Sequence, residues 1–237
     1  MFYIGEARPL APSDLALLAQ RHGVEERALR AIVAVEAAGK AFHSSGALVC
    51  LYEPHIAYRY TSGATRDALV NAGLAYAKWG TKPYPKSSFS RIDRCARIAG
   101  EEVAALASSW GAPQMMGFNH KVCGYPSAVQ MVKSFAASEA NQIEAMIRFI
   151  KSNRKMFGAL QAHNWETFAY HYNGPGYAKN GYHTKLAKAY AKAPATPTPT
   201  KPTITKKPAL PNGKSSGFLA TLITAIVNLI SRIFKRK

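Results

Sequence analysis

Cysteine is scarce in this chain of 237 residues, and no two cysteines form a CxxC pair. The three present, Cys50, Cys95 and Cys123, are odd in number and widely spaced, so neither a complete disulfide framework nor a zinc knuckle is indicated. Buried, reduced thiols are predicted, which suits synthesis in a cytosol. A cysteine peptidase would need a placed Cys–His pair, and Cys50 near His55 is too little. The seven histidines include no HExxH or similarly spaced pair, so no metal and no cofactor are predicted.

Acidic residues are also few, and no signal peptide is expected at the N-terminus. Asp and Glu number 13 against 31 Lys and Arg, a formal net charge of +18, which predicts attraction to nucleic acid, anionic lipid or an anionic envelope polymer. The chain shows no nucleic-acid-binding motif, so nucleic acid is not expected as a partner. Glu6 and Pro9 interrupt any apolar core of a signal peptide. An extracytoplasmic role would therefore need another route out of the cell.

The most informative stretch is a glutamate in an apolar run. Residues 31–42 read AIVAVEAAGKAF, and Glu36 shares one face of a predicted helix over residues 25–38 with apolar side chains. Gly39 is expected to end that helix, which puts Glu36 near the negative end of the helix dipole. Apolar surroundings and the dipole both raise a carboxyl pKa, and an acid still protonated near neutral pH can serve as a general acid. A glutamate that points to solvent is the alternative.

Helical periodicity continues along most of the chain. Ser13 is expected to cap the first helix, and Ser90 with Asp93 to form a capping box. Apolar residues at helical spacing within residues 139–151 are predicted to face the core. Helices are predicted over residues 13–22, 25–38, 91–107, 127–137, 139–151 and 164–173, with a last one that ends near residue 190. Residues 61–90 are predicted to be partly irregular, and residues 48–52, LVCLY, fit a strand or a buried helix segment equally well.

Further candidate site residues follow apolar runs or lie in loops. Glu53 ends the LVCLY run and is the second carboxylate expected near Glu36; an ion pair with Arg59 or another base is the alternative. A Gly- and Pro-rich loop over residues 108–126 offers amide groups and a flat apolar face, which suit N-acetylated sugars. Its side chains of interest are Trp110, Gln114 and Asn119. Aromatic residues of the 61–90 segment either line a sugar groove or pack in the interior, namely Tyr76, Trp79, Tyr84 and Phe89.

Three segments together resemble the lysozyme-like superfamily of peptidoglycan glycosidases. They are VEAAGKAF around Glu36, SWGAPQMMG from Ser109, and YHYNGPGY, which contains Tyr172 and Asn173. More closely, the chain resembles the N-acetylmuramidase family of phage endolysins over residues 13–190. The resemblance implies a mainly α (α+β, lysozyme-like) fold, with a single helical catalytic domain over residues 1–190 and a deep cleft.

The same resemblance assigns roles to individual residues. It implies Glu36 as the catalytic acid, and it places Ser109, Gln114, Tyr172 and Asn173 along the saccharide cleft. Glu53 matches the family's glutamate that follows an apolar run and precedes a histidine, and it is the second catalytic candidate. One departure concerns Ala37, which stands where many lysozyme-like enzymes have a serine directly after the catalytic glutamate.

A muramidase is the function that this resemblance implies. Glu36 would protonate the leaving oxygen of the β-1,4 bond between N-acetylmuramic acid and N-acetylglucosamine in bacterial peptidoglycan. The alternatives are a lytic transglycosylase that forms 1,6-anhydro products and a non-catalytic membrane-permeabilising protein. We expect a monomer, made in the host cytoplasm without a signal peptide, that acts on the cell wall in the periplasm or from outside when added to cells.

The composition changes after residue 190. Residues 191–216 are rich in Pro, Thr and Lys and predict an extended linker, and residues 217–237 predict a cationic amphipathic helix too short and two-faced to span a membrane. Nine positive charges lie after residue 191, which leaves a net +9 for residues 1–191. The tail therefore predicts binding to an anionic membrane or lipopolysaccharide, and access through a Gram-negative outer membrane; docking on the enzyme or in an oligomer seam is the alternative. The expected membrane-binding residues are Phe218, Leu222, Ile226, Leu229, Ile233, Arg232 and Lys235.

Overall fold

A computed structural model describes residues 1–194, which form a mainly helical structure with one small sheet. The predicted class, mainly α with a minor β part, is confirmed. The helices are α1 (Pro12–His22), α2 (Glu26–Glu36), α3 (Pro54–Arg59), α4 (Gly63–Asn71), α5 (Phe89–Leu106), α6 (Ala128–Ala137), α7 (Glu139–Ser152), α8 (Arg154–Gln161), α9 (Trp165–Asn173) and α10 (Tyr182–Lys192). The strands are β1 (Cys50–Tyr52), β2 (Ser108–Trp110) and β3 (Met115–Met116), and short 3-10 helices span Gly117–Asn119 and Tyr177–Asn180.

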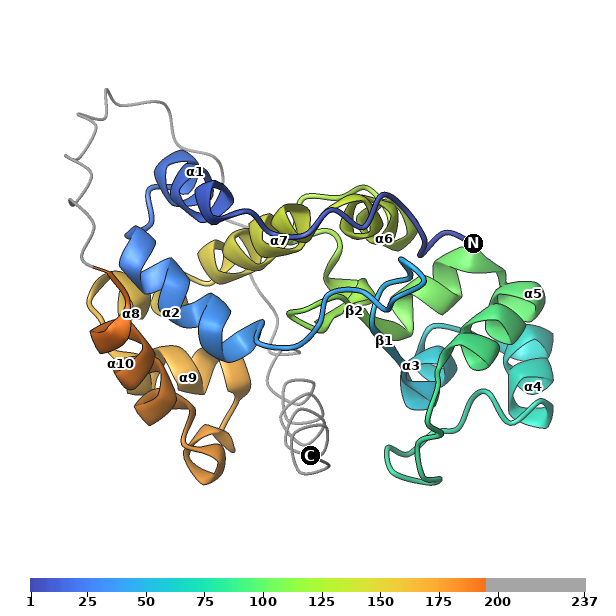
Figure 1. The fold of residues 1–237 in the computed structure, drawn as a ribbon. Helices are drawn as coiled ribbons and strands as arrows, with labels where there is room; N and C mark the ends of the chain where they lie inside the picture. Colours follow the sequence, from blue (N-terminus) through green and yellow to red (C-terminus); the bar gives the residue numbers. More distant parts are fainter. Residues whose placement is uncertain (195–237) are drawn as a thin grey trace, which may run out of the picture.

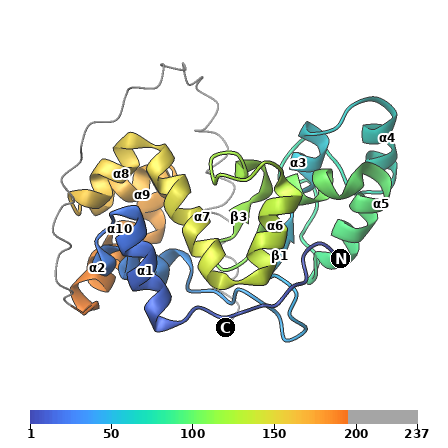
Figure 2. The same ribbon diagram turned by 90° about the horizontal axis from the view of Figure 1, so that it is seen from above.

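The elements gather in two groups joined by α6, α7 and the sheet (Figures 1 and 2). One group contains α1, α2, α8, α9 and α10, and the other contains α3, α4 and α5. Each group surrounds its own apolar cluster, and the stripe predicted for α7 faces one of them, because Ile143, Met146, Ile147 and Ile150 are all buried. Residues 195–237, which hold most of the predicted linker and all of the predicted amphipathic helix with its membrane-binding residues, lie outside the described residues.

The first two helices differ from the predictions at their ends. Helix α1 begins at Pro12. Proline suits the first position of a helix because a backbone N–H there would have no partner within the helix. The carboxylate of Asp14 accepts a hydrogen bond from the Ala11 amide at 2.9 Å. The predicted cap at Ser13 is therefore wrong. Helix α2 ends at Glu36, two residues earlier than predicted, because Ala37 already has non-helical angles (φ −122°, ψ 26°).

The sheet decides between the two readings of LVCLY in favour of a strand. Strands β1, β2 and β3 are antiparallel in that order, with Cys50 paired to Trp110 and Ser109 paired to Met116. The Gly- and Pro-rich segment after residue 107, predicted to lack regular helix, thus contains two short strands. This places Glu53 directly at the end of β1, an edge strand that pairs with the central strand β2.

Three helices were not predicted, and one predicted cap is wrong. Helix α3 directly follows strand β1 and Glu53. Helix α4 lies inside the segment expected to be partly irregular, and α8 follows α7 after a break at Asn153. Helix α5 begins at Phe89, and the predicted capping box does not form, because Asp93 accepts a hydrogen bond from the Tyr3 hydroxyl at 2.8 Å. Long-range contacts of this kind compete with local capping.

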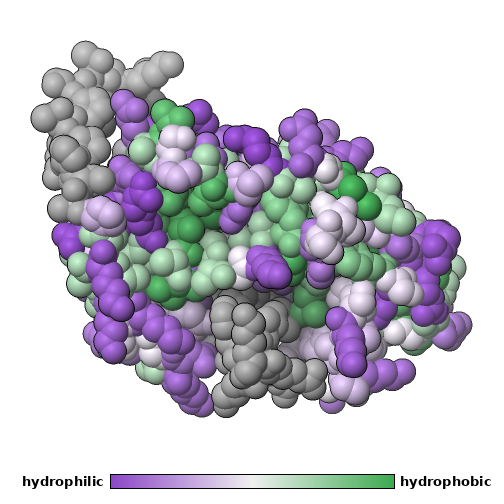
Figure 3. All heavy atoms as spheres, viewed as in Figure 1, coloured by the Kyte–Doolittle hydropathy of each residue, from purple (hydrophilic) through white to green (hydrophobic). Residues whose placement is uncertain are grey.

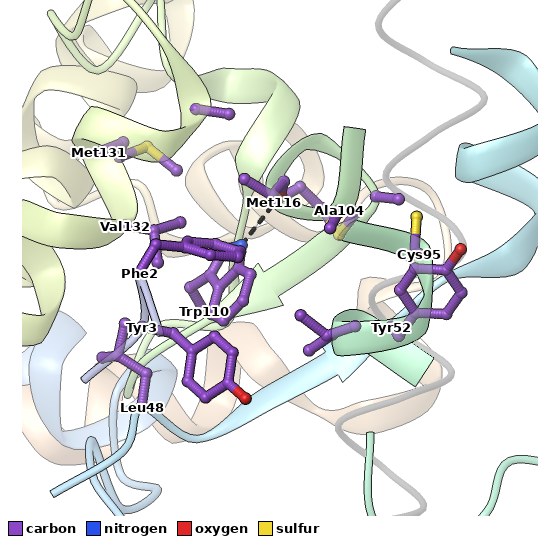
Figure 4. Close-up of a cluster of buried hydrophobic side chains, with 14 of the residues drawn as sticks. Phe2, Tyr3, Leu48, Tyr52, Cys95, Ala104, Trp110, Met116, Met131 and Val132 are labelled. Atoms are coloured by element: carbon purple, nitrogen blue, oxygen red, sulfur yellow. Dashed lines mark hydrogen bonds between the residues drawn. The ribbon is translucent and has the colours of Figure 1, made fainter. Parts of the chain in front are cut away.

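Trp110 lies in the middle of one apolar cluster (Figure 4). It is fully buried, its ring centroid is 5.7 Å from that of Phe2, and its Nε1 donates a hydrogen bond to the Ala105 carbonyl at 3.0 Å. The prediction that Trp110 presents a flat face to a sugar is therefore wrong. The tryptophan instead fixes strand β2 against the core.

The three thiols are free, as predicted, and two of them, Cys95 and Cys123, are buried. Burial raises the pKa of the Cys50 and Cys123 thiols to about 12, which keeps both protonated and unreactive. Within residues 1–194, no helix combines the length and the apolar character needed to cross a membrane.

Candidate active site

Glu36 is the final residue of α2, and only 5% of it is exposed. Helix α2 packs against α1 and α10, so its last turn lies in the interior of the group formed by α1, α2, α8, α9 and α10. This placement excludes the alternative in which Glu36 points to solvent. A carboxyl with so little access to water is costly unless it is partnered or protonated.

The pKa of Glu36 is raised from 4.5 to about 7, and burial is the main cause. A hydrogen bond from Asn173 and the positive charge of Lys185 act in the opposite direction. Oε1 accepts this bond from Asn173 Nδ2 at 3.0 Å, and Oε2 has no hydrogen-bond partner among the described residues. Burial therefore favours a Glu36 carboxyl that keeps its proton near neutral pH, the condition that a general acid requires.

Asn173 and Tyr172 reach this carboxyl from the end of α9. The predicted break at the Asn-Gly-Pro-Gly turn is observed, because Gly174 adopts φ 77° and ends the helix at Asn173. The Tyr172 ring stacks on Phe168 with centroids 5.6 Å apart. Burial and the nearby Glu36 hold the pKa of Tyr172 well above its ordinary value, so the hydroxyl remains a hydrogen-bond donor. The structure thus brings three of the predicted site residues together, Glu36, Tyr172 and Asn173.

Glu53 belongs to the other group of elements, between β1 and α3 (Figure 1). It is 3% exposed, and its Oε2 accepts a hydrogen bond from the Tyr84 hydroxyl at 2.5 Å and lies 3.2 Å from His55 Nδ1. An ion pair with Arg59 is not formed within residues 1–194, and the base that lies at ion-pair distance, the other form of that alternative, is His55. Oε1 accepts no hydrogen bond from any described residue. One oxygen of Glu53 is therefore held in place and the other remains available.

Ser109 lies in strand β2, and Gln114 lies in the loop that connects β2 and β3. The Ser109 hydroxyl donates to Gln114 Oε1 at 2.9 Å, and Gln114 Nε2 donates to the Gly111 carbonyl at 2.7 Å. Buried Gln142 of α7 fixes the same loop by accepting a hydrogen bond from the Ala112 amide at 2.8 Å. These bonds give the loop a defined shape, and the role of Ser109 and Gln114 in saccharide binding stays a prediction.

Sequence reasoning did not assign three residues that contact or influence the two carboxyls. Tyr84 was one of four aromatic candidates for a sugar groove, and His55 follows Glu53 by two residues, so both carried a weak local signal. Lys185 carried none, because its relation to Glu36 depends on how α10 packs on α2. Of the other aromatic candidates, Phe89 stacks on Tyr3 in the core, with centroids 5.4 Å apart. Within the described part of the chain, no group of three or more His, Cys, Asp or Glu side chains is arranged to hold a metal ion.

Comparison with known proteins agrees with this arrangement. The model of the N-acetylmuramidase family matches residues 25–194. The crystal structure of the Burkholderia AP3 phage endolysin is similar to this chain with a TM-score of 0.72 at 37% sequence identity, over 78% of this chain and 71% of that one. No curated protein matches. The chain therefore belongs to the N-acetylmuramidase family of phage endolysins, which are peptidoglycan hydrolases.

Proposed function

We propose that the protein hydrolyses the β-1,4 bond between N-acetylmuramic acid and N-acetylglucosamine, with Glu36 as the general acid. The observation that carries this proposal is a buried carboxyl at the end of α2 whose pKa is raised to about 7. Glu36 gives its proton to the leaving glycosidic oxygen as the bond breaks. Asn173 keeps the carboxyl oriented through its bond to Oε1, and the unpartnered Oε2 is available to carry the proton.

Glu53 is the second catalytic carboxyl in this proposal. Tyr84 holds its Oε2 by a hydrogen bond, and His55 lies beside the same oxygen, which leaves Oε1 to accept a hydrogen bond from the water that attacks the anomeric carbon, or to stabilise the positive charge that develops there. The two carboxyls come from opposite groups of elements (Figure 1), as expected for side chains that flank a bound glycan from two sides.

Product analysis on purified peptidoglycan tests this function. Digestion followed by mass spectrometry should yield a free reducing end on N-acetylmuramic acid. A 1,6-anhydro end would instead identify a lytic transglycosylase, in which the same acid assists attack by the muramyl 6-hydroxyl. A reducing end on N-acetylglucosamine would show that the other glycosidic bond is cut.

The tail supplies access to the wall in this proposal. An apolar stripe and four positive charges give the sequence of residues 217–237 the character of a helix that binds an anionic surface, and five further positive charges lie between residues 192 and 214. A cationic amphipathic helix can disturb an outer membrane rich in anionic lipopolysaccharide and expose the peptidoglycan behind it. Salt should weaken the effect, because the initial attraction is electrostatic.

Truncation separates the two activities. Helix α10 continues to Lys192, and Arg27 donates hydrogen bonds to the carbonyls of Tyr190 and Ala191, so the cut is best placed after Pro194. Residues 1–194 should digest purified peptidoglycan nearly as well as the full chain but should lose dye leakage from anionic vesicles and killing of intact Gram-negative cells. Equal killing by the truncated protein would contradict the role of the tail.

A further inference from the structure

A groove of about 820 Å³ follows α2 and α10, which lie side by side in Figures 1 and 2. Its surface is largely apolar and is formed by Leu15 of α1, by Val33 and Val35 of α2 and by several alanines. On the face shown in Figure 3, hydrophobic residues gather over α2 with hydrophilic ones beside them. The groove is thus an apolar channel at the surface of the group that holds Glu36.

One end of this groove lies beside Glu36. The two helices are antiparallel, because Arg27 near the start of α2 donates a hydrogen bond to the carbonyl of Tyr190 near the end of α10, at 2.9 Å. The start of α10 therefore accompanies the end of α2, where Glu36 lies. Tyr182 and Lys185 from that first turn line the groove, and both interact electrostatically with Glu36.

Three lysines of α10 line the groove at helical spacing, Lys185, Lys188 and Lys192. Offsets of three and four residues place them on one face of the helix, and they extend over about 10 Å along its axis at 1.5 Å per residue. All three are exposed, and none forms an ion pair with a carboxylate of residues 1–194. The fourth cation, Arg30, already pairs with Glu26 at 2.5 Å. The groove therefore offers a row of three available positive charges beside an apolar surface.

The three lysines beside an apolar surface indicate what kind of ligand the groove can bind. Without Lys192, which belongs to the groove itself, the sequence after residue 194 carries eight positive charges, and these disfavour the chain's own tail because like charges would be brought together. An anionic ligand with small apolar groups is favoured instead.

We propose that this groove binds the peptide stem that peptidoglycan carries on N-acetylmuramic acid. The inference rests on the proposed function, in which the bond broken is at C1 of that same sugar, so the stem begins within one sugar of Glu36. Stem peptides carry alanine methyl groups, which match the alanine-rich surface, and side-chain and terminal carboxylates, which match the lysines. About three extended residues cover about 10 Å, the length of the lysine row.

Cleavage of two matched substrates tests this proposal in the full-length protein. One substrate is peptidoglycan with intact stems, and the other is the same glycan after an amidase has removed the stems. The variant is Lys188→Glu/Lys192→Glu, which spares Lys185 because that residue influences Glu36. The control is Lys121→Glu/Lys133→Glu, which makes the same charge change away from the groove. Both lysines are exposed; Lys133 lies in α6, and Lys121 lies in the segment that precedes it.

The quantity to compare is the ratio of kcat/KM on the stem-bearing glycan to kcat/KM on the stripped glycan. Reversal of two exposed charge contacts should lower this ratio by about fivefold, mainly through KM, and the control should leave it unchanged. An unchanged ratio in the groove variant, or an equal fall in the control, would overturn the proposal. Cleavage of neither substrate by the wild type would refute the proposed muramidase function itself, which is a separate result.

Two direct binding measurements do not depend on cleavage. Titration with the soluble tripeptide L-Ala-γ-D-Glu-diaminopimelate should shift NMR resonances of α10 in the wild type, and the groove variant should lose these shifts. Absence of shifts in the wild type would contradict the proposal. Cosedimentation with anionic phospholipid vesicles tests a lipid occupant, and a groove variant that loses vesicle binding but keeps its substrate ratio would show that the lysines serve lipid and that the stem assignment is wrong.

Discussion

Replacement of Glu36 by glutamine should stabilise the protein at alkaline pH while it removes activity. The substitution keeps the volume and polarity of the side chain, but the amide cannot ionise or donate a carboxylic proton. Activity on purified peptidoglycan should fall by at least about a hundredfold, the scale of general acid catalysis. A variant with wild-type turnover would refute the assignment of Glu36 as the acid.

The stability change follows from the pKa of Glu36. Its rise from 4.5 to about 7 on folding corresponds to about 3 kcal/mol, at 1.36 kcal/mol per unit. Because the folded state holds the proton more tightly, the carboxyl costs nothing below its unfolded pKa. Stability is lost as the pH rises between the two values, and the full cost is present above the folded pKa. Glutamine at this position never bears that cost.

Urea unfolding of both proteins at about pH 4 and about pH 8 measures this effect. The free energy of unfolding of the variant minus that of the wild type should be about 3 kcal/mol larger at the higher pH than at the lower one, because the variant is then the more stable protein. Glu101→Gln is the matched control, since Glu101 is exposed on α5, and it should show no comparable pH dependence. If the difference for Glu36→Gln is the same at both pH values, burial does not raise the pKa of the carboxyl and the reasoning fails.

Two further substitutions test the groups around the carboxyls. Asn173→Ala removes a hydrogen bond that lowers the pKa of Glu36, so the alkaline limb of the kcat/KM profile should move upward by about one pH unit or less; a downward shift would contradict this. Glu53→Gln should lower kcat by about a hundredfold with an unchanged melting temperature, and Tyr84→Phe, which removes one of the groups that hold Oε2, should lower it by about tenfold. Loss of the fold in Glu53→Gln would instead indicate a structural role for Glu53.

The fold was predictable where local pattern and tertiary packing agree. The apolar stripe of α7 is an example, because helical spacing alone indicates which of its residues are buried. The caps at Ser13 and Ser90 were wrong because Pro12 began one helix earlier and Tyr3, distant in sequence, binds Asp93. Loop composition was also misleading for Trp110, since glycine and proline around it indicated a surface loop, whereas the tryptophan belongs to a strand that enters the core.

The candidate site shows the same division between local and distant information. Glu36 was detectable because a charged residue within an apolar helix face is itself a local signal of an unusual environment. Its partner Asn173 is 137 residues away, and the helix-ending turn around it predicted an accessible side chain but not the group that it would bind. Lys185 could not be assigned at all, because a lysine on the exposed face of a helix is ordinary until α10 is placed against the end of α2. The pKa of Glu36 is thus determined by burial that the sequence indicates and by two charged or polar contacts that only the packing of α9 and α10 supplies.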